Sequence, residues 1–590
     1  MFQVRPNEPD YARLHDPVSQ TVNRYGTPID TVPAGHTLRA QAFVINGEAC
    51  PSQNPNRYKQ HGFFFNADNC IACHACEAAC SEKNDNPAHI AFRSVGFVEG
   101  GVYPNMQRLN ISMACNHCDD PVCLKGCPTR AYTKFAEYGA VLQDPDICFG
   151  CGYCTWVCPY NAPQLDPIKG QVSKCNMCVD RLEVGLKPAC VSACLGKALD
   201  FGVVENIPEG RSQAKTEIPG FPRTDITHPN IRFQQTRSTQ RDMVRMDSTP
   251  LKYHRDDGSG KFTPVLDPKY GFNRQWNLKK LLTSHENAHI AFTLSVQAVM
   301  GAFLMLLTLA SALNTLPVLL ALMALMGFGL ARLNLHLGKP LRFYRGFNNW
   351  RLSPVSREIA GVSLFFGGLG GVTFLTLFPG FPLAALLQPA AAAAALLGLG
   401  FGGFYMYKLY RIKARPFWDH WQTGASFVGT GLGLGGLLLG LLGLLGMAPG
   451  GMTPELAATL GGLMAAGFTL EGLGLLAHAR DLKARGDEGA ASHYEQTTRY
   501  GQPYLLRNGL LGLSLILAAL LALTGAAALF APLTLTALSA AILGRALFYV
   551  LVIPTTLPGA FFWRNKGFVE HAREVGLADM PQLGVVPDTH

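Results

Sequence analysis

Cysteine spacing is the feature that most constrains this chain. Sixteen of its 17 cysteines fall into four quartets between Cys70 and Cys194, and none follows Cys194. The first and third quartets have the C-x2-C-x2-C-x3-C spacing of bacterial ferredoxins, whereas the second and fourth have longer middle gaps. The pattern predicts iron–sulfur clusters held by four quartets: Cys70, Cys73, Cys76 and Cys80; Cys115, Cys118, Cys123 and Cys127; Cys148, Cys151, Cys154 and Cys158; Cys175, Cys178, Cys190 and Cys194.

The last cysteine of each quartet is expected to serve a different cluster from the first three. In two-cluster ferredoxins the fourth cysteine ligates the other cluster, so the quartets should exchange their last cysteines in pairs. Each irregular quartet then needs a regular partner. Zinc knuckles and disulfides are the alternatives, but zinc sites close with four ligands without such runs, and dense free cysteines suit a reducing compartment or a metal. Cys50 lies outside every quartet and is interpreted as a spare thiol.

The sequence after the cysteines is strongly apolar. The chain has 590 residues, of which 48% are hydrophobic and 15% charged. Its second half contains eight apolar segments, each long enough to cross about 30 Å of hydrocarbon as a helix. These segments cover residues 288–312, 316–335, 357–379, 383–408, 422–446, 455–478, 506–528 and 531–553.

Positive charges in the connecting loops predict the orientation of these spans. The links after the second, fourth, sixth and eighth segments are rich in Lys and Arg, and the alternate links contain neither. Because positive loops stay in the cytoplasm, we expect an inner-membrane protein whose termini and cluster domain face the cytoplasm. Residues 1–40 agree, since they show no apolar signal region and no twin-arginine pair. The net charge of +9 then belongs largely to membrane edges, which argues against nucleic-acid binding.

Together these patterns predict an α+β four-cluster ferredoxin-like domain, built from two pseudo-twofold bicluster modules, followed by an all-α bundle of eight transmembrane helices. We expect a polar N-terminal extension over residues 1–61 and the cluster domain over residues 62–200. Residues 201–284 are interpreted as an extended linker or a clasp on a partner. The membrane anchor is expected over residues 285–555 and a cytoplasmic tail over residues 556–590.

Several motifs resemble one known family. Residues 62–250 resemble the four-cluster iron–sulfur subunit of the dimethyl sulfoxide reductase family at Cys115-Asn-His-Cys118, Cys127-Pro-Thr129 and Cys154 to Tyr160. Residues 284–553 resemble that family's membrane anchor at His285-Glu286, Leu335-His336-Leu337-Gly338 and Glu358-Ile359. The chain therefore looks like two subunits fused into one.

The resemblance implies which quartets exchange their cysteines. The first pairs with the fourth and the second with the third, and all sixteen ligands of four [4Fe-4S] clusters are kept. The implied ligand sets are Cys70, Cys73, Cys76 and Cys194; Cys175, Cys178, Cys190 and Cys80; Cys115, Cys118, Cys123 and Cys158; Cys148, Cys151, Cys154 and Cys127.

The resemblance also implies the partners. Catalysis in that family resides in a separate molybdopterin subunit, so this chain would carry electrons between that subunit and a quinone or quinol in the lipid membrane. His336 and Glu358 match the family's proposed quinol-site histidine and acid, and both are expected at the cytoplasmic membrane edge beneath the cluster domain. Arg342, Arg345 and Trp350 in the connecting loop would line the same pocket. A helix-capping histidine and an ion-paired Glu358 are the structural alternatives.

Two further features of the apolar segments need an interpretation. Glu471 and Arg545 are costly within a membrane, and we expect them to form an ion pair inside the bundle. Gly431-x-Gly433-x-x-Gly436 spells a dinucleotide-binding fingerprint, but it lies inside an apolar span without a preceding strand. Close helix packing explains these glycines better.

The substrate of the complex is less constrained. Relatives with this anchor either reduce S-oxides and similar acceptors with quinol or oxidise sulfite and reduce quinone. A cytoplasmic cluster domain favours sulfite oxidation, because sulfite arises in the cytoplasm of sulfur oxidisers. Quinol-driven reduction of dimethyl sulfoxide or a similar S- or N-oxide is the alternative, and an ion-translocating module of the polysulfide reductase type is another. Sixteen intact ligands argue against a mere scaffold.

Overall fold

The computed structural model forms two compact units, Met1–Asp267 with Pro554–His590, and Pro268–Ile553. The first is called the N-terminal unit and the second the helical unit. The residues described are 7–15, 20–32, 34–37, 44–45, 48–49, 54–87, 89–208, 211, 214–245, 249–268, 271–283, 286–310, 312–553 and 555. Cys50, His285 and the expected tail over residues 556–590 lie outside them.

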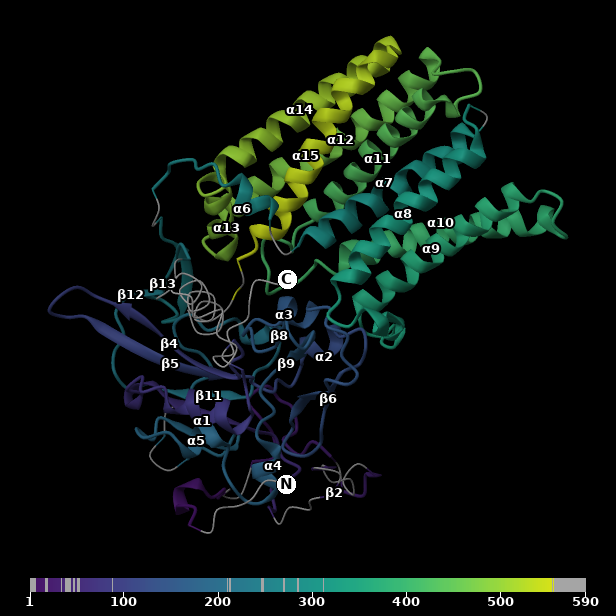
Figure 1. Ribbon diagram of the computed structural model, residues 1–590. Coiled ribbons are helices and arrows are strands. Elements are labelled where there is room, and N and C mark those ends of the chain that lie inside the picture. The colour runs from purple at the N-terminus through teal and green to yellow at the C-terminus, as the bar shows by residue number, and fades with distance from the viewer. Residues whose placement is uncertain are drawn as a thin grey trace, which may run out of the picture. The chain divides into compact units, whose positions relative to one another are not determined.

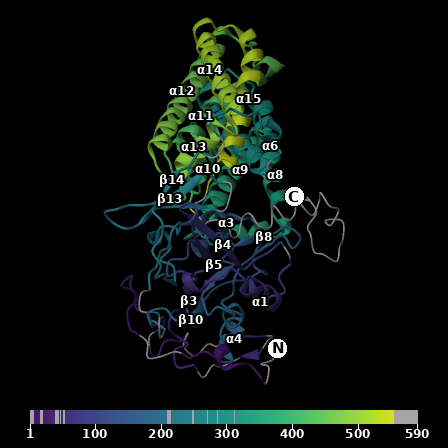
Figure 2. The ribbon, with the colours of Figure 1, turned by 90° about the vertical axis from the view of Figure 1, so that its left-hand side faces the viewer.

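The N-terminal unit is an α+β arrangement of small sheets and short helices (Figures 1 and 2). Its strands are β1 Val44–Ile45, β2 Glu48–Ala49, β3 His61–Asn66, β4 Arg93–Gly100, β5 Gln107–Ala114, β6 Tyr132–Lys134, β7 Val141–Gln143, β8 Gln164–Asp166, β9 Gln171–Ser173, β10 Leu199–Val203, β11 Ile231–Gln234, β12 Asp242–Arg245, β13 Leu251–Arg255 and β14 Phe262–Leu266. Its α-helices are α1 Ala75–Lys83, α2 Val122–Gly126, α3 Tyr153–Val157, α4 Val179–Glu183 and α5 Ala189–Ser192.

Strand β3 lies at the centre of the core. It pairs antiparallel with β10 and parallel with β11, in the order β10-β3-β11. The run Phe63, Phe64 and Phe65 is at most 2% exposed, because the strand is covered on both faces and needs no polar alternation. The same hydrophobic core contains Cys76 and Cys115, so the cysteines lie inside the fold.

Residues 201–284 differ from the expected extended linker. Strand β11 joins the central sheet, and β12, β13 and β14 extend a five-stranded sheet in the order β14-β13-β12-β4-β5. Side chains such as Met243 and Tyr253 are buried and alternate with more exposed neighbours, as a half-buried strand requires. The strands are short and separated by polar sequence, so their alternation of buried and exposed residues is difficult to recognise in the sequence. The described part of the N-terminal extension includes a 3-10 helix, Asp10–Ala12, which Arg13 and Leu186 tie to the unit through a β-bridge.

The helical unit confirms the eight predicted spans. Among the described residues, eight helices are long and apolar enough to cross a membrane. They are α7 Asn287–Leu309, α8 Thr315–His336, α9 Pro354–Leu377, α10 Ala384–Lys408, α11 Gln422–Leu442, α12 Pro454–Ala484, α14 Gly501–Thr524 and α15 Phe530–Val550, with the shorter α6 Leu278–Leu282 and α13 Glu488–Thr497 between or before them. The chain is therefore a multi-pass membrane protein.

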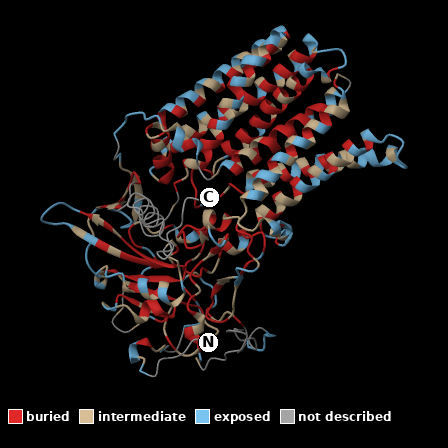
Figure 3. Cartoon of the chain, viewed as in Figure 1, coloured by how far each residue is buried: buried red, intermediate tan, exposed pale blue. Residues whose placement is uncertain are grey.

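Helices α7 and α11 form the buried centre of this unit (Figure 3). Their backbones meet at glycines, since a Cβ at Gly301 would overlap the carbonyl oxygen of Gly431. Gly433 and Gly436 face side chains of α12, since a Cβ would lie 2.4 Å from Phe468 and 2.7 Å from Met464. Small residues allow such close helix approach in membranes, so the apparent dinucleotide fingerprint is a packing motif.

Candidate functional site

Each cysteine quartet begins with a chain reversal in the left-handed backbone region. His74 has a φ of 60° before α1, His117 a φ of 43° between the first two cysteines of its quartet, and Cys178 a φ of 51° before α4. In the third quartet glycine occupies the corresponding turn, with Gly152 at 70° before α3. In the first three quartets the reversal and the short helix after it bring the first three thiols around one volume, whereas the third cysteine of the fourth quartet, Cys190, lies on α5.

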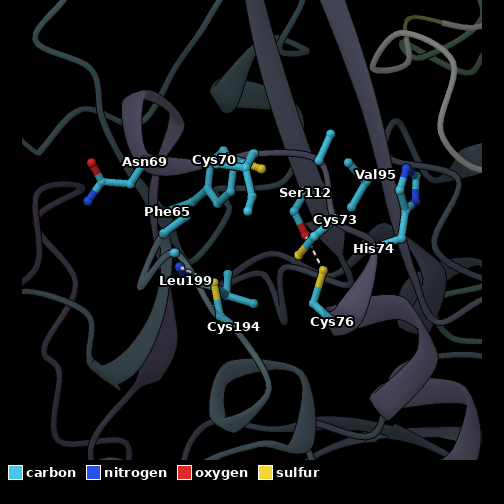
Figure 4. A pocket seen from close by; sticks show the side chains of 14 residues that line it. Phe65, Asn69, Cys70, Cys73, His74, Cys76, Val95, Ser112, Cys194 and Leu199 are labelled. Carbon is cyan, nitrogen blue, oxygen red and sulfur yellow. Dashed lines mark hydrogen bonds between the residues drawn. The ribbon is translucent and has the colours of Figure 1, made fainter.

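Cysteines from the two ends of the cysteine-rich sequence meet in one pocket. Cys70, Cys73 and Cys76 line it together with Cys194, which follows α5 (Figure 4). Phe65, Val95 and Leu199 supply apolar walls. This is the set that the resemblance implies for one cluster.

A second pocket unites the second and third quartets. Its thiols are Cys115, Cys118, Cys123 and Cys158, again the set that the resemblance implies. Tyr160 and Lys174 also line it. The fold therefore brings the last cysteines of the fourth and third quartets, Cys194 and Cys158, to their partner quartets.

The remaining eight thiols form two further groups. Burial raises the pKa of the Cys80 thiol, and neighbouring Cys190, Cys175 and Cys178 raise it further. Burial likewise raises the pKa of Cys178 to about 12, with Cys190 as the next cause. A buried thiolate is unfavourable without a cation, so this group is suited to bind metal.

The fourth group shows the same electrostatics. Burial raises the pKa of Cys154, and Cys151, Cys127 and Cys148 raise it further, against a hydrogen bond from Tyr132. Four buried thiols without a balancing cation again suit metal binding.

Backbone N–H groups point at cysteine sulfurs throughout these sets. The N–H groups of Leu199, Met177 and Ala131 donate to Cys194, Cys175 and Cys127, each over 3.4 Å from nitrogen to sulfur. Such N–H···S bonds stabilise thiolates and tune cluster potentials.

Three buried polar side chains lie between neighbouring cysteine sets, and sequence reasoning missed all of them. Arg93 faces thiols of the Cys70 and Cys80 sets. Lys174 Nζ lies 3.5 Å from Cys115 Sγ and donates to the carbonyl of Cys175 over 2.9 Å. Tyr132 lies beside Cys154 and Cys123. Ordinary strand and loop positions hold these residues, so no motif marks them.

The candidate quinone residues lie near one end of the helical unit. His336 closes α8, and its ring centroid is 5.0 Å from that of His289 on α7, edge-on. His289 Nδ1 lies 2.9 Å from Glu286 Oε2, and its ring is 5.8 Å from that of Tyr549 on α15. His289, Glu286 and Tyr549 therefore extend the group that the sequence predicted around His336 and Glu358.

Glu358 reaches the same group from α9. It is 7% exposed and forms no ion pair with any described residue, so the alternative of a loop-arginine pair is not supported. It lies near Tyr410, whose hydroxyl is 2.6 Å from that of Tyr549. Burial raises the pKa of Tyr410, and Tyr549 and Glu358 raise it further. Glu358 therefore lies near an aromatic group, Tyr410, Tyr549 and His289, that extends to His336.

The connecting loop is aromatic and half exposed. Arg342 and Arg345 are in a 3-10 helix, Pro340–Phe347, that follows α8 directly, and Trp350 is 60% exposed just after it. Exposed aromatic and basic side chains of this kind suit a membrane–water interface. These three residues therefore follow His336 at the same end of α8.

The predicted ion pair between Glu471 and Arg545 is wrong in its direct form. Arg545 donates to Gln297 Oε1 over 2.7 Å and to Thr430 Oγ1 over 3.5 Å, and Thr430 donates to Glu471 Oε2 over 3.4 Å. The threonine hydroxyl separates the charges because α11 lies between α12 and α15. Thr430 and Glu471 also line a cavity with Arg507.

Comparisons with known proteins fit both units. Residues 106–204 match the family model of a 4Fe-4S dicluster domain, and residues 282–551 match that of the DMSO reductase anchor subunit. A chain of the anaerobic dimethyl sulfoxide reductase of Haemophilus influenzae is 39% identical over 182 residues, covering 29% of this chain and 88% of that protein. The Escherichia coli K12 protein of the same description is 39% identical over 180 residues, covering 29% of this chain and 87% of its own.

A relative with a different description also matches. A subunit of the sulfite dehydrogenase of Allochromatium vinosum is 36% identical over 173 residues, covering 26% of this chain and 72% of that protein. These matches confirm the predicted fold class, an α+β cysteine-rich ferredoxin domain followed by eight long apolar helices.

Proposed function

Because the protein belongs to the dimethyl sulfoxide reductase family, as a 4Fe-4S electron-transfer subunit fused to its membrane anchor, we propose that it relays electrons between a molybdopterin catalytic subunit and membrane quinone. The observation that carries this proposal is the gathering of sixteen cysteines into four sets in a chain with eight candidate spans. When bound, [4Fe-4S] clusters accept and release single electrons.

The four sets form an ordered series in this proposal. Arg93 joins the set of Cys70 to that of Cys80, and Lys174 joins the latter to the set of Cys115. Tyr132 joins the set of Cys115 to that of Cys127. The protein would bind one cluster in each set, exclude water from it and hydrogen-bond its thiolates.

The catalytic subunit is proposed to cover the set of Cys70, at one end of this series. Cys73 is exposed, whereas most other cysteines of the sets are buried. Ile71 and Leu195, beside this pocket, are 67% and 75% exposed. An apolar rim around an accessible cluster site suits a permanent partner that must approach closely for electron transfer.

The quinone is proposed to bind near His336 and Glu358. Quinone chemistry moves two protons with two electrons, so its site needs groups that hold and move protons. His336 and His289 can exchange a proton with a quinone oxygen, and Glu286 orients His289. Arg342, Arg345 and Trp350 are proposed to border this site at the membrane interface.

The orientation remains as the positive loops predict. We propose that the N-terminal unit, the C-terminal tail and the quinone end of the bundle face the cytoplasm. Residues 62–200 would form the cluster domain and residues 285–555 the anchor. Within residues 201–284, the partly exposed edge strand β14 is proposed to contact the partner.

Sulfite is the proposed substrate of the catalytic subunit, with electrons flowing to quinone. The positive loops support it, because they predict that the cluster domain faces the cytoplasm, where sulfite arises in sulfur oxidisers. The identity to chains of dimethyl sulfoxide reductases favours the alternative, quinol-driven reduction of an S- or N-oxide. An ion-translocating module would need a series of polar groups from one end of the bundle to the other. The described network of Glu471, Thr430 and Arg545 is a local one in the interior of the bundle.

Purification of the chain with its copurifying subunits tests these proposals. The complex should contain iron and acid-labile sulfide, and it should reduce a quinone analogue when given sulfite. Activity with S-oxides and a quinol analogue, but not with sulfite, would select the alternative. Activity with neither donor–acceptor pair would refute both assignments.

A further inference from the structure

Arg93 is a buried cation at the first residue of β4. It is 1% exposed, and its guanidinium carbon lies 4.5 Å from the ring centroid of Phe63. Nη1 donates to Ser112 Oγ over 3.0 Å, and this hydroxyl lies 3.4 Å from Cys76 Sγ. Nε and Nη2 are buried and have no hydrogen-bond partner among the described residues. Two buried donors are therefore available to a group bound between the cysteine sets.

Among the residues that the structure describes, no carboxylate forms an ion pair with Arg93. Burial would lower the pKa of its guanidinium, but Cys190, Cys76, Cys175 and Cys80 together hold it above the usual range. These thiols come from two sets, one with Cys76 and one with the other three. A buried charge without a counter-charge is strongly unfavourable, and the thiols of these two sets are the nearby groups that can supply one when deprotonated.

Three other buried arginines of the N-terminal unit each pair with a carboxylate. Arg57 contacts Glu183 over 3.0 Å, and Arg181 contacts Glu8 over 3.1 Å. Arg232 is 3% exposed and pairs with Glu205. Arg93 differs from these three arginines, and it lies near thiols of two sets.

We propose that Arg93 is a positioning residue for electrons, whose charge is shared by the cluster sites on its two sides and allows both to be reduced at once. This inference rests on the proposed cluster ligation. A cluster with four thiolates is anionic and gains one more negative charge with each electron, without making or breaking a bond. The guanidinium stabilises that added charge at both sites and screens their mutual repulsion. Two-electron donors such as quinol or sulfite could then pass both electrons to the series of clusters.

Redox titration of the full-length chain, followed by electron paramagnetic resonance, tests this inference. In Arg93→Gln the ratio of reduced to oxidised cluster at a fixed ambient potential should fall at least tenfold for two clusters, which is about 59 mV for a one-electron couple. The signal of magnetically coupled reduced clusters should weaken with it. Arg93→Lys keeps the charge and should change the ratio less than threefold. Arg232→Gln, the control, should leave all four ratios unchanged.

Each result has a defined meaning. Unchanged ratios in Arg93→Gln at full iron content would overturn the inference. If Arg93→Gln fails to assemble, Arg93→Lys decides: full iron content with near wild-type ratios supports a charge effect, and loss of the same clusters shows a merely structural residue. A wild-type chain without iron–sulfur signals would instead refute the proposed function.

Discussion

The histidine that sequence reasoning missed offers a sharp test of the quinone site. His289 lies between His336, at 5.0 Å from ring to ring, and Glu286, at 2.9 Å from Nδ1 to Oε2. In His289→Gln we expect quinol oxidation by the purified complex to fall about 100-fold, because proton transfer by a positioned side chain contributes at least that factor.

A structural role predicts a much smaller effect. The side chains of His289 and Glu286 are 15% and 27% exposed, and an ion pair at such a site contributes about 1 kcal/mol at most. That free energy corresponds to roughly a fivefold change in an equilibrium. The two roles therefore differ by more than an order of magnitude in rate.

Two assays on the same preparation separate quinone chemistry from cluster damage. A quinol analogue delivers electrons through the proposed site, whereas a reduced viologen delivers them directly to the clusters. His289→Gln should lose the first activity and retain the second. His420→Gln provides a matched control, since this half-buried histidine packs against His478, 5.0 Å from ring to ring. Quinol oxidation within fivefold of wild type, or a parallel loss of the viologen activity, would refute the reasoning.

Three further predictions concern the cysteine sets and the bundle. Cys194→Ser should remove or convert one cluster and spare the other three, which iron analysis and electron paramagnetic resonance would reveal; loss of the cluster in the Cys80 set instead would contradict the proposed exchange. Gly301→Ala should lower the free energy of unfolding of the bundle by about 1–3 kcal/mol in thermal unfolding, because the added Cβ overlaps the facing backbone of α11. Gly403→Ala is the control: its Cβ meets nothing within 4 Å, so this change should be neutral or stabilising. Thr430→Val should lower the free energy of unfolding by about 1–3 kcal/mol, because it removes the hydroxyl between the side chains of Glu471 and Arg545. Equal stability of Thr430→Val and of the exposed control Thr469→Val would exclude this bridging role of the hydroxyl.

Much of the site could be predicted because it depends on the spacing of cysteines that are close together in the sequence. Three cysteines within one reversal are brought together by the backbone alone, and the family resemblance supplied the fourth. Pockets that contain Cys194 with Cys70, and Cys158 with Cys115, agree with that expectation. The eight spans were likewise predictable, because length and apolar content are properties of a single segment.

Contacts between distant elements could not be predicted in this way. Glu471 and Arg545 have similar expected depths in the bundle, but depth does not determine which helix lies between them, and α11 inserts Thr430. The strands after residue 201 were missed because their short alternating pattern has meaning only beside β3 and β4.

The sequence by itself determined the kind of chemistry and the membrane location of this protein. Four thiol quartets require a metal–sulfur system, and eight long apolar segments require a membrane. Only the tertiary structure decided what surrounds that chemistry. It placed Arg93 between two thiol sets and Tyr410 and Tyr549 between Glu358 and His289. The physical reason is that ligand type and hydropathy are properties of short segments, whereas buried charge and proton contacts depend on which segments pack together.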